Sequence, residues 1–290
     1  MRKKKYVDNL VKNKPLLDSM RKRMSVENLS SDTVESYVRG VIQLEHFSGK
    51  CLEDLTPEDV LTFLFYLKDD QKRARTTIRI AASGIKYFYQ HIVERQDMVK
   101  IIPNPKIELH LPEILSGKEI KKLFDLTENI KHLTIMKVAY SAGLRRSEIQ
   151  NLRVEDINSK KMEIRVRQGK GKKDRNTILA KNALLTLRKY YTELKPEGIL
   201  FYGRNKHEQI SESALAWILA RAAQRAEITR KISTHTLRHS FASHQLSMGT
   251  DLFTIKRLLG HEDIRTTMLY LHINSNDNKP IKSPLDLIYP

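Results

Sequence analysis

The stretch that decides how the chain is organised is "KIIPNPKIELHLPEIL", Lys100–Leu115. It contains three prolines close together: Pro103, Pro105 and Pro112. A proline disfavours helical backbone in the residue before it, so this stretch favours an extended segment. The chain on both sides has the residue spacing of helices. We therefore predict two domains, residues 1–100 and 113–290, joined by an extended linker at residues 101–112.

The first domain has the pattern of a small helical bundle. Apolar residues recur at the spacing of one helical face in residues 31–49, 56–70 and 74–95. Ser31 or Asp32 is the expected N-cap of the first stretch, because such side chains accept hydrogen bonds from unpaired backbone N–H groups. Three such faces can bury one another, so we expect a self-contained helical core.

The second domain combines helical stretches with one stretch of strand pattern. In "KKMEIRVRQGKGKKDRNTILA", residues 160–180, Met162, Ile164 and Val166 alternate with polar residues. Two glycines then mark a turn, and "RNTILA" returns as a second strand. The other stretches read as helices, including "IRTTMLYLHI" at residues 264–273. The predicted fold is therefore mainly α with one small antiparallel β-sheet.

The chain is strongly basic, with 52 Lys and Arg residues against 34 Asp and Glu residues and a net charge of +18. The charge is spread through both halves, which favours nucleic acid as the partner. An anionic membrane surface is the weaker alternative, because no helical stretch has a segregated basic face. Arg79 and Lys86 occupy polar positions of the first domain and are candidate phosphate contacts; the alternative is an ordinary solvated face.

Several classes of protein are excluded. Cys51 is the only cysteine, so an intrachain disulfide and a cysteine-rich zinc site are ruled out. No run approaches the ~20 apolar residues of a membrane-spanning helix. The N-terminal "MRKKKYVDNLVKNK" is basic but lacks the apolar region of a secretory signal. We therefore expect a cytoplasmic protein with no membrane partner.

Two motifs of the second domain combine glycine with basic residues. In "AGLRRSE", Arg145 has Glu148 three residues on, which is also the spacing of an ordinary surface ion pair on a helix. In "GKGKKDR", Lys170 lies between two glycines at the expected hairpin tip, where it could reach into a groove. The alternative for Lys170 is an exposed turn that binds nothing specific. Taken alone, neither motif identifies a site.

Two further motifs carry histidine, arginine and tyrosine. In "HTLRHSFA", His235 and Arg238 share one helix face, where they could accept a proton and bind phosphate oxygens. His235 and His239 also have the spacing of a zinc pair, but no other ligand cluster accompanies them. In "LLGHEDIRTTMLY", His261 is followed by Tyr270, which taken alone could be an aromatic residue of a core helix.

Together, the four motifs supply what phosphodiester cleavage without a metal needs. Two guanidiniums neutralise the non-bridging oxygens of the phosphate. A histidine accepts the tyrosine proton, because free tyrosine, with a pKa near ~10, is a poor nucleophile at neutral pH. A lysine donates a proton to the leaving 5′-oxygen, and the tyrosine holds the phosphate covalently. In chain order the set is Arg145, Lys170, His235, Arg238, His261 and Tyr270.

With these motifs the chain resembles the tyrosine recombinases, or phage-type integrases, over essentially its whole length. The resemblance implies a C-shaped clamp, in which a helical, SAM-like core-binding domain and a catalytic domain close around double-stranded DNA. It implies a homo-tetramer in the synaptic complex and a monomer or dimer off DNA, with no cofactor and no metal. Within the family, the length resembles Xer-type recombinases, and the tail "IKSPLDLI" resembles integron and insertion-element integrases. An accessory protein partner would not be visible in the sequence.

The resemblance also implies the chemistry of the site. Tyr270 would attack a DNA phosphate and form a 3′-phosphotyrosyl bond, with His235 as general base and Lys170 as general acid. The phosphate would be held by Arg145, Arg238 and His261.

Other residues are expected to act around this centre. Glu148 is expected to position the catalytic side chains without contacting the DNA itself. Basic residues would contact DNA phosphates, which position the protein but carry no sequence information directly. The candidates are Arg79, Lys86 and Lys172.

Three alternatives remain open at this stage. A type IB topoisomerase uses a similar set of residues to relax supercoils without joining partner strands. A DNA-binding architectural protein would keep the basic surface but have a silent active site. A zinc hydrolase would require more ligands than His235 and His239.

Overall fold

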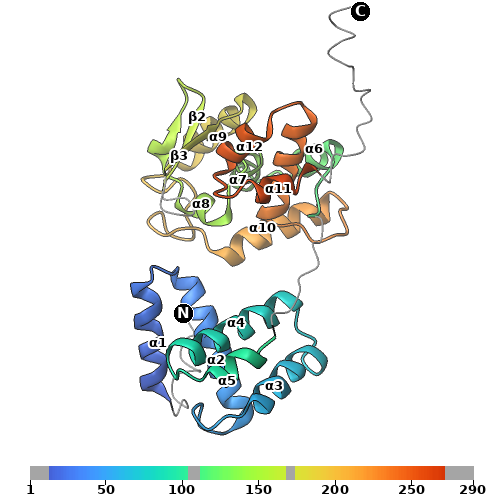
Figure 1. Cartoon of the computed structure of the whole chain (residues 1–290). Coiled ribbons are helices and arrows are strands. Elements are labelled where there is room, and N and C mark those ends of the chain that lie inside the picture. The colour runs from blue at the N-terminus through green and yellow to red at the C-terminus, as the bar shows by residue number, and fades with distance from the viewer. Residues whose placement is uncertain (1–12, 104–111, 168–173, 272–290) are drawn as a thin grey trace, which may run out of the picture. The chain divides into compact units, whose positions relative to one another are not determined.

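The computed structural model describes residues 13–103, 112–167 and 174–271. The chain divides into two compact units, Met1–Leu109 and His110–Pro290 (Figure 1). The division falls inside the stretch that we predicted to be the linker. Ile101, taken as the first linker residue, is instead the last residue of a short helix.

The described part of the first unit is a bundle of helices, drawn from blue to blue-green in Figure 1. Its core is formed by apolar side chains of every helix, and α2 packs most extensively against α4. A Cβ atom on Gly84 of α4 would lie 2.7 Å from the Cα of Tyr37, so only glycine permits this close crossing. The helices are α1 (Lys14–Val26), α2 (Ser31–Ser48), α3 (Pro57–Asp69), α4 (Arg75–His91) and α5 (Gln96–Ile101).

The helix ends in this unit largely follow the sequence signals. Thr56 caps α3 in a capping box with Asp59, and Gly49 ends α2 with a φ of 67°. The predicted N-cap of α2 was wrong by one position or more. Ser30 is the N-cap, because its Oγ accepts a hydrogen bond of 3.2 Å from the backbone N–H of Thr33.

The described part of the second unit is mainly helical, as predicted, with one three-stranded antiparallel sheet in the order β1-β2-β3. The strands are β1 (Ile157–Asn158), β2 (Glu163–Val166) and β3 (Arg175–Ile178). The two predicted strands are confirmed, with Ile164 paired to Thr177. The sequence did not reveal β1, which is only two residues long and too short to show a period.

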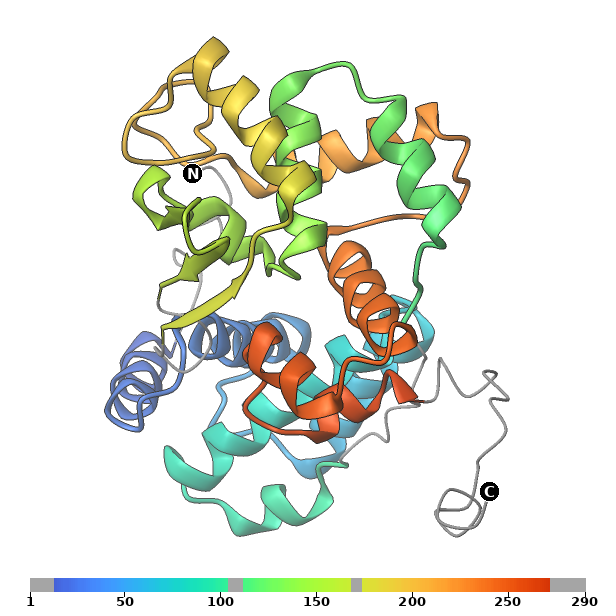
Figure 2. The ribbon, with the colours of Figure 1, turned by 90° about the horizontal axis from the view of Figure 1, so that it is seen from above.

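The helices of the second unit pack around a large apolar core, and α11 contacts both α7 and α12, as can be followed in Figure 2. This places the ends of α7 and α12 beside the buried face of α11. The helices are α6 (Gly117–Asp125), α7 (Ile130–Ser141), α8 (Arg146–Asn151), η1 (Val154–Asp156), α9 (Lys181–Leu194), α10 (Glu212–Arg225), α11 (Thr234–Ser247), α12 (Leu252–Leu259) and α13 (Arg265–Met268).

Within the described residues the predicted helix over 264–273 is interrupted, because α13 ends at Met268 and Leu271 is helical again only after a turn. Tyr270 lies in this turn. The backbone N–H of Tyr270 donates to the carbonyl oxygen of Thr267, three residues back, at 3.1 Å. An i→i−3 hydrogen bond of this kind belongs to a turn tighter than that of an α-helix. Residues 272 and 273 lie outside the described part of the chain.

Within the described ranges, no helix has the length and apolar character needed to cross a membrane.

Candidate active site

A buried carboxylate, Glu148, lies at the centre of the candidate site. It is in the first turn of α8, which begins directly after Arg145, and its side chain is 4% exposed. Its Oε2 accepts a hydrogen bond of 2.8 Å from the backbone N–H of Arg145. Its Oε1 accepts a second bond of 2.8 Å from Nη1 of the same residue. The Arg145–Glu148 spacing therefore reflects a buried pair, and the surface-pair alternative is excluded.

A second arginine, which the sequence analysis did not select, binds the same carboxylate. Arg175 of β3 donates from Nη1 to Oε1 of Glu148 at 2.7 Å and from Nη2 to Oε2 at 2.8 Å. This bidentate geometry is the strongest form of an arginine–carboxylate pair. A signal was present in the sequence, because period-2 spacing puts Arg175 on the same face of β3 as the buried Thr177.

The arginines keep Glu148 ionised. Burial alone would raise its pKa, but the hydrogen bonds and charges of Arg175 and Arg145 outweigh burial and lower the pKa to about 2. A third guanidinium approaches the carboxylate as well, since Nη1 of Arg238 lies 3.8 Å from Oε2. Glu148 thus acts as the common counter-charge of three arginines.

Three successive carbonyl groups at the end of α12 each accept a hydrogen bond from a different arginine. Arg175 Nε donates to the oxygen of Leu258 at 2.9 Å. Arg238 Nη2 donates to Leu259 at 2.7 Å, and Arg145 Nη2 donates to Gly260 at 2.9 Å. The last carbonyls of a helix lack partners within the helix and carry partial negative charge, so cations stabilise them. The end of α12 therefore orients all three guanidiniums.

Glycine is required where α12 ends. Gly260 has a φ of 62°, a left-handed conformation that side chains with a Cβ atom rarely adopt. A Cβ atom there would lie only 2.8 Å from the Cδ of Arg175. The glycine of "LLGHEDIRTTMLY" thus makes room for an arginine from a distant part of the chain.

Arg238 is the most deeply buried of the three arginines, with 3% of its surface exposed. Its Nη1 donates to the carbonyl oxygen of Gly143, directly after α7, at 2.6 Å. Burial and the charge of Arg145 lower the pKa of Arg238 to about 9, so the side chain stays cationic at neutral pH. Three guanidiniums around one carboxylate leave positive charge in excess, which suits an anionic ligand such as phosphate.

His261 follows this end of α12 directly and is partly buried. Its Nδ1 lies 2.8 Å from Oγ1 of Thr267. Burial, together with the charges of Arg238 and Arg145, lowers the pKa of His261 to about 3. The ring is therefore neutral at neutral pH, and its other nitrogen remains available for a ligand.

Tyr270 is buried, with 1% of its surface exposed, and belongs to a small apolar cluster with Phe241 and Leu259. Its hydroxyl lies 2.9 Å from Nδ1 of His239 on α11, and the two ring centroids are 5.7 Å apart. Burial raises the pKa of Tyr270, while the charges of Arg238 and Arg145 act in the opposite direction. Tyr270 therefore packs in an apolar core and also lies close to the cluster of arginines.

His239 was considered in the sequence only as one half of a zinc pair, and its contact with Tyr270 was missed. The signal was its place beside Arg238 in "HTLRHSFA", but the tyrosine comes from 31 residues further on. Among the described residues no group of three or more His, Cys, Asp or Glu side chains could hold a metal ion.

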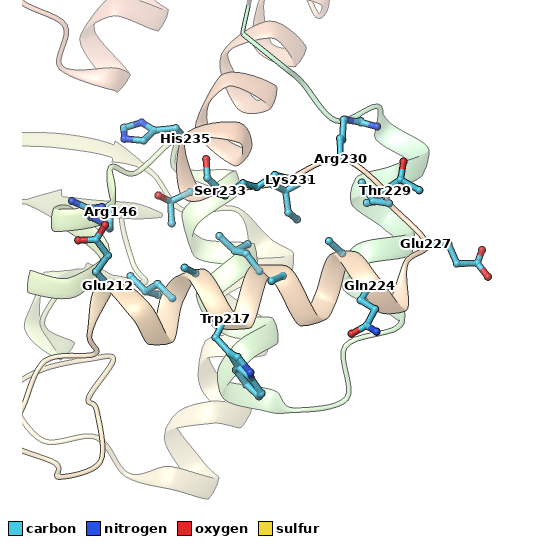
Figure 3. Close-up of a pocket in the computed structure, with 18 residues that line it drawn as sticks. Arg146, Glu212, Trp217, Gln224, Glu227, Thr229, Arg230, Lys231, Ser233 and His235 are labelled. Atoms are coloured by element: carbon cyan, nitrogen blue, oxygen red, sulfur yellow. Dashed lines mark hydrogen bonds and ion pairs between the residues drawn. The ribbon is translucent and has the colours of Figure 1, made fainter. Parts of the chain in front are cut away.

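His235 lies on an exposed part of α11. Its ring centroid is 6.3 Å from that of His239. Desolvation by its surroundings and the charges of Arg238 and Arg146 lower its pKa. His235 and Arg146 mark one end of a groove of about 820 Å³ along α10, in which Arg146 pairs with Glu212 (Figure 3). Arg145 binds the buried Glu148, whereas its neighbour Arg146 pairs with the exposed Glu212. The two arginines therefore lie in different environments.

The remaining predicted residues lie away from this cluster or outside the described chain. Lys170 and Lys172 fall within residues 168–173, which the structure does not describe. Arg79 and Lys86 both lie on α4 of the first unit, Arg79 exposed and Lys86 half-buried. Their spacing of seven residues puts them on one helix face. Within the described ranges neither has an acidic partner.

The structure thus brings five of the predicted catalytic residues into one unit, around three helix ends. Comparison with known protein families gives a consistent result. The phage integrase family matches residues 113–277, and the N-terminal SAM-like domain of phage integrases matches residues 16–97. The chain therefore belongs to the phage integrase family, the tyrosine recombinases, which are enzymes of site-specific DNA recombination.

Individual relatives cover nearly the whole chain. A putative integrase/recombinase y4qK of Sinorhizobium fredii is 36% identical over 275 residues, which is 94% of this chain and 89% of the relative. Tyrosine recombinase XerA of Pyrococcus horikoshii is 29% identical, covering 91% of this chain and 90% of XerA. Among solved structures, a XerA recombinase is 28% identical with a TM-score of 0.53 and covers 90% of this chain and 94% of its own.

A structure of a lambda integrase dimer bound to a COC′ core site shares the fold at lower identity. Its TM-score is 0.73 at 19% identity, and the match covers 92% of this chain and 98% of the integrase chain.

Proposed function

We propose that this recombinase cuts and rejoins double-stranded DNA through a 3′-phosphotyrosyl intermediate on Tyr270, without metal or ATP. The observation that supports this most strongly is the position of Tyr270. Its hydroxyl meets a histidine of α11, the helix that also carries Arg238. The charges of Arg238 and Arg145 act on the tyrosine directly. The proposed nucleophile, Tyr270, thus lies beside the cationic side chains that would bind the phosphate it attacks.

The arginine cluster would bind the scissile phosphate. Guanidiniums fixed by Glu148 and by the end of α12 are already oriented, so little reorganisation is needed when charge develops on the phosphate. Arg145 and Arg238 would neutralise the non-bridging oxygens, and His261 would donate from its free nitrogen. Glu148 would remain ionised throughout, because its pKa is about 2.

Two protons must move during cleavage. The bond between the Tyr270 oxygen and phosphorus forms while the bond from phosphorus to the 5′-oxygen breaks. A histidine of α11 takes the tyrosine proton, a role that the sequence assigned to His235, and Lys170 protonates the leaving 5′-oxygen. The 5′-hydroxyl of a partner strand then reverses the attack. One phosphodiester replaces another, so no external energy source is required.

The partner is double-stranded DNA, and the working assembly is a homo-tetramer in the synaptic complex, with a monomer or dimer off DNA. Solved relatives include a XerH recombinase bound to a difH substrate and a lambda integrase tetramer bound to a Holliday junction. The proposals of DNA as the partner and of a tetramer as the assembly both rest on the fold shared with these proteins. Arg79, Lys86 and Lys172 would contact DNA phosphates, and a cytoplasmic location is part of the same proposal.

The test is to trap the intermediate. The protein is incubated with nicked suicide duplexes from a pool that includes DNA flanking its own gene, with EDTA present, and denaturation-resistant adducts are recovered and sequenced. We expect an adduct that Tyr270→Phe abolishes while DNA binding is retained. An adduct that disappears with EDTA would contradict the metal-free chemistry. Relaxation of any supercoiled plasmid without a preferred site would instead favour a type IB topoisomerase.

A further inference from the structure

The histidine that meets the nucleophile is His239, one helical turn beyond the predicted base His235. The Tyr270 hydroxyl lies 2.9 Å from Nδ1 of His239, and no hydrogen bond joins it to His235 within the described residues. The two histidines are four residues apart on α11, which corresponds to about one turn and about 6 Å of rise. Nδ1 of His239 is therefore already placed to accept the proton of the Tyr270 hydroxyl. His235, in contrast, is exposed.

Burial of the tyrosine leaves few other acceptors for its proton. Tyr270 is 1% exposed, so its hydroxyl is shielded from bulk water. Its ring packs in the cluster of Phe241, Ile255 and Leu259, which offers no proton acceptor. The nearby charged groups, Arg238 and Arg145, are cations and cannot take a proton. Among the described residues the hydrogen-bond partner of this hydroxyl is His239.

On these grounds, and resting on the proposed function above, we propose that His239 orients the Tyr270 hydroxyl and takes its proton as the phosphotyrosyl bond forms. In this step the proton moves from the tyrosine oxygen to Nδ1 of His239, the oxygen–phosphorus bond forms, and the bond to the 5′-oxygen breaks. The 5′-oxygen receives its proton from Lys170. When a 5′-hydroxyl later attacks, its proton passes to Lys170, the new oxygen–phosphorus bond forms, and the bond from phosphorus to the Tyr270 oxygen breaks as Tyr270 recovers its proton from His239. His235 is then free to contact the phosphate.

The charges around His239 are consistent with this role. His235 and Arg238 face it from its own helix, and His261 and Tyr270 face it from the chain that follows α12. Burial, with His235 and Arg238, lowers its pKa to about 4, so its ring is neutral and able to accept a proton at neutral pH. A bound phosphate would add negative charge beside Arg238 and raise this pKa, which makes His239 a stronger base when DNA is present.

The experiment separates orientation from proton acceptance. In His239→Asn the amide oxygen can occupy the position of Nδ1 and accept the hydroxyl hydrogen bond, but it cannot take a proton. The substrate is the nicked duplex whose sequence was recovered from the adduct, made with a sulfur atom in place of the bridging 5′-oxygen. A thiolate leaves without protonation, so the rate then does not depend on proton donation to the leaving group. His244→Asn is the matched control, because His244 lies on α11 like His239 and its Nδ1 lies 2.7 Å from the hydroxyl of Tyr140 on α7.

We expect His239→Asn to slow covalent attachment about 100-fold or more at pH 7. Its rate should rise about tenfold per pH unit between pH 7 and 9, since the tyrosine must then ionise before it attacks. His244→Asn should keep the rate and pH profile of the unsubstituted protein. His239→Gln serves as a second variant, and DNA binding by each variant verifies the fold.

The outcomes distinguish this inference from the function it rests on. Failure of the unsubstituted protein to form any Tyr270 adduct would overturn both. A normal adduct whose rate in His239→Asn and His239→Gln is unchanged, or lowered equally at every pH, would overturn only the role of His239 as proton acceptor. Faster attachment in these variants would do so as well, because it would show that the hydrogen bond restrains Tyr270.

Discussion

The guanidinium of Arg175 and the carboxylate of Glu148 form two parallel hydrogen bonds of 2.7 and 2.8 Å, although the residues are 27 positions apart. This pair ties the β-sheet to the start of α8. Through the remaining bonds of Glu148 and Arg175 it also fixes Arg145 and the end of α12. Several consequences of this connected cluster can be measured.

Removal of the charge of Glu148 should destabilise the protein strongly. Glu148→Gln leaves three buried or partly buried guanidiniums without their common counter-charge. We expect a loss of about 3–5 kcal/mol in the free energy of unfolding, measured by chemical denaturation. Glu212→Gln is the control, because Glu212 pairs with Arg146 on the surface and should cost less than about 1 kcal/mol. Equal losses in the two variants would contradict the central role of Glu148.

Arg145 and Arg146 are neighbours in sequence with different expected roles. Arg145→Lys keeps the charge but loses the planar fork that binds Glu148 and the oxygen of Gly260 at once. We expect the rate of covalent DNA attachment to fall about 100-fold. Arg146→Lys, which alters a surface pair with Glu212, should change the rate by less than about threefold. The reverse order of effects would show that the wrong arginine was selected.

The glycine at the end of α12 should resist substitution. Gly260→Ala introduces a strained positive φ and a contact of 2.8 Å with the Cδ of Arg175. Gly249→Ala introduces a positive φ of 87° but has no atom within 4 Å of the new Cβ. The strain is common to both, so the difference in unfolding free energy reports the contact with Arg175. We expect Gly260→Ala to be worse by about 1–3 kcal/mol, whereas equal costs would argue against this contact.

Stability should depend on pH through His261. Its folded-state pKa is about 3, well below the ordinary value of 6.5, so protonation favours the unfolded chain. The stability that this neutral histidine contributes is complete above pH 6.5 and is lost as the pH falls toward 3. His261→Gln should therefore flatten the fall in unfolding free energy between pH 6.5 and 4. An equal fall in His261→Gln and in the unsubstituted protein would contradict this role of His261.

The helices and the catalytic motifs could be predicted from the sequence, because both depend on local spacing. Apolar periodicity located most of the helices, and residues such as Thr56 and Gly49 marked their ends. The contacts that build the site could not be predicted in the same way. Arg175 binds Glu148, and His239 contacts Tyr270, only after distant segments of the chain have packed together. Local residue spacing does not predict such long-range contacts.

Two misses have different physical causes. β1 is two residues long and has no period to detect. The helix around Tyr270 was predicted from apolar spacing, but the turn at Thr267 tightens and the tyrosine leaves the regular helix. In the second case Tyr270 is buried with Phe241 of α11 and Leu259 of α12, and local spacing does not show such tertiary contacts.

The central claim is that Tyr270 becomes bonded to DNA, and identification of the modified residue tests it most directly. The trapped adduct would be digested with nuclease and protease, and the peptide that carries the nucleotide would be sequenced by mass spectrometry. We predict a nucleotide on Tyr270, absent in Tyr270→Phe and retained in Tyr140→Phe, where the other tyrosine paired with α11 is changed. A nucleotide on another residue, or an adduct that persists in Tyr270→Phe, would contradict the account.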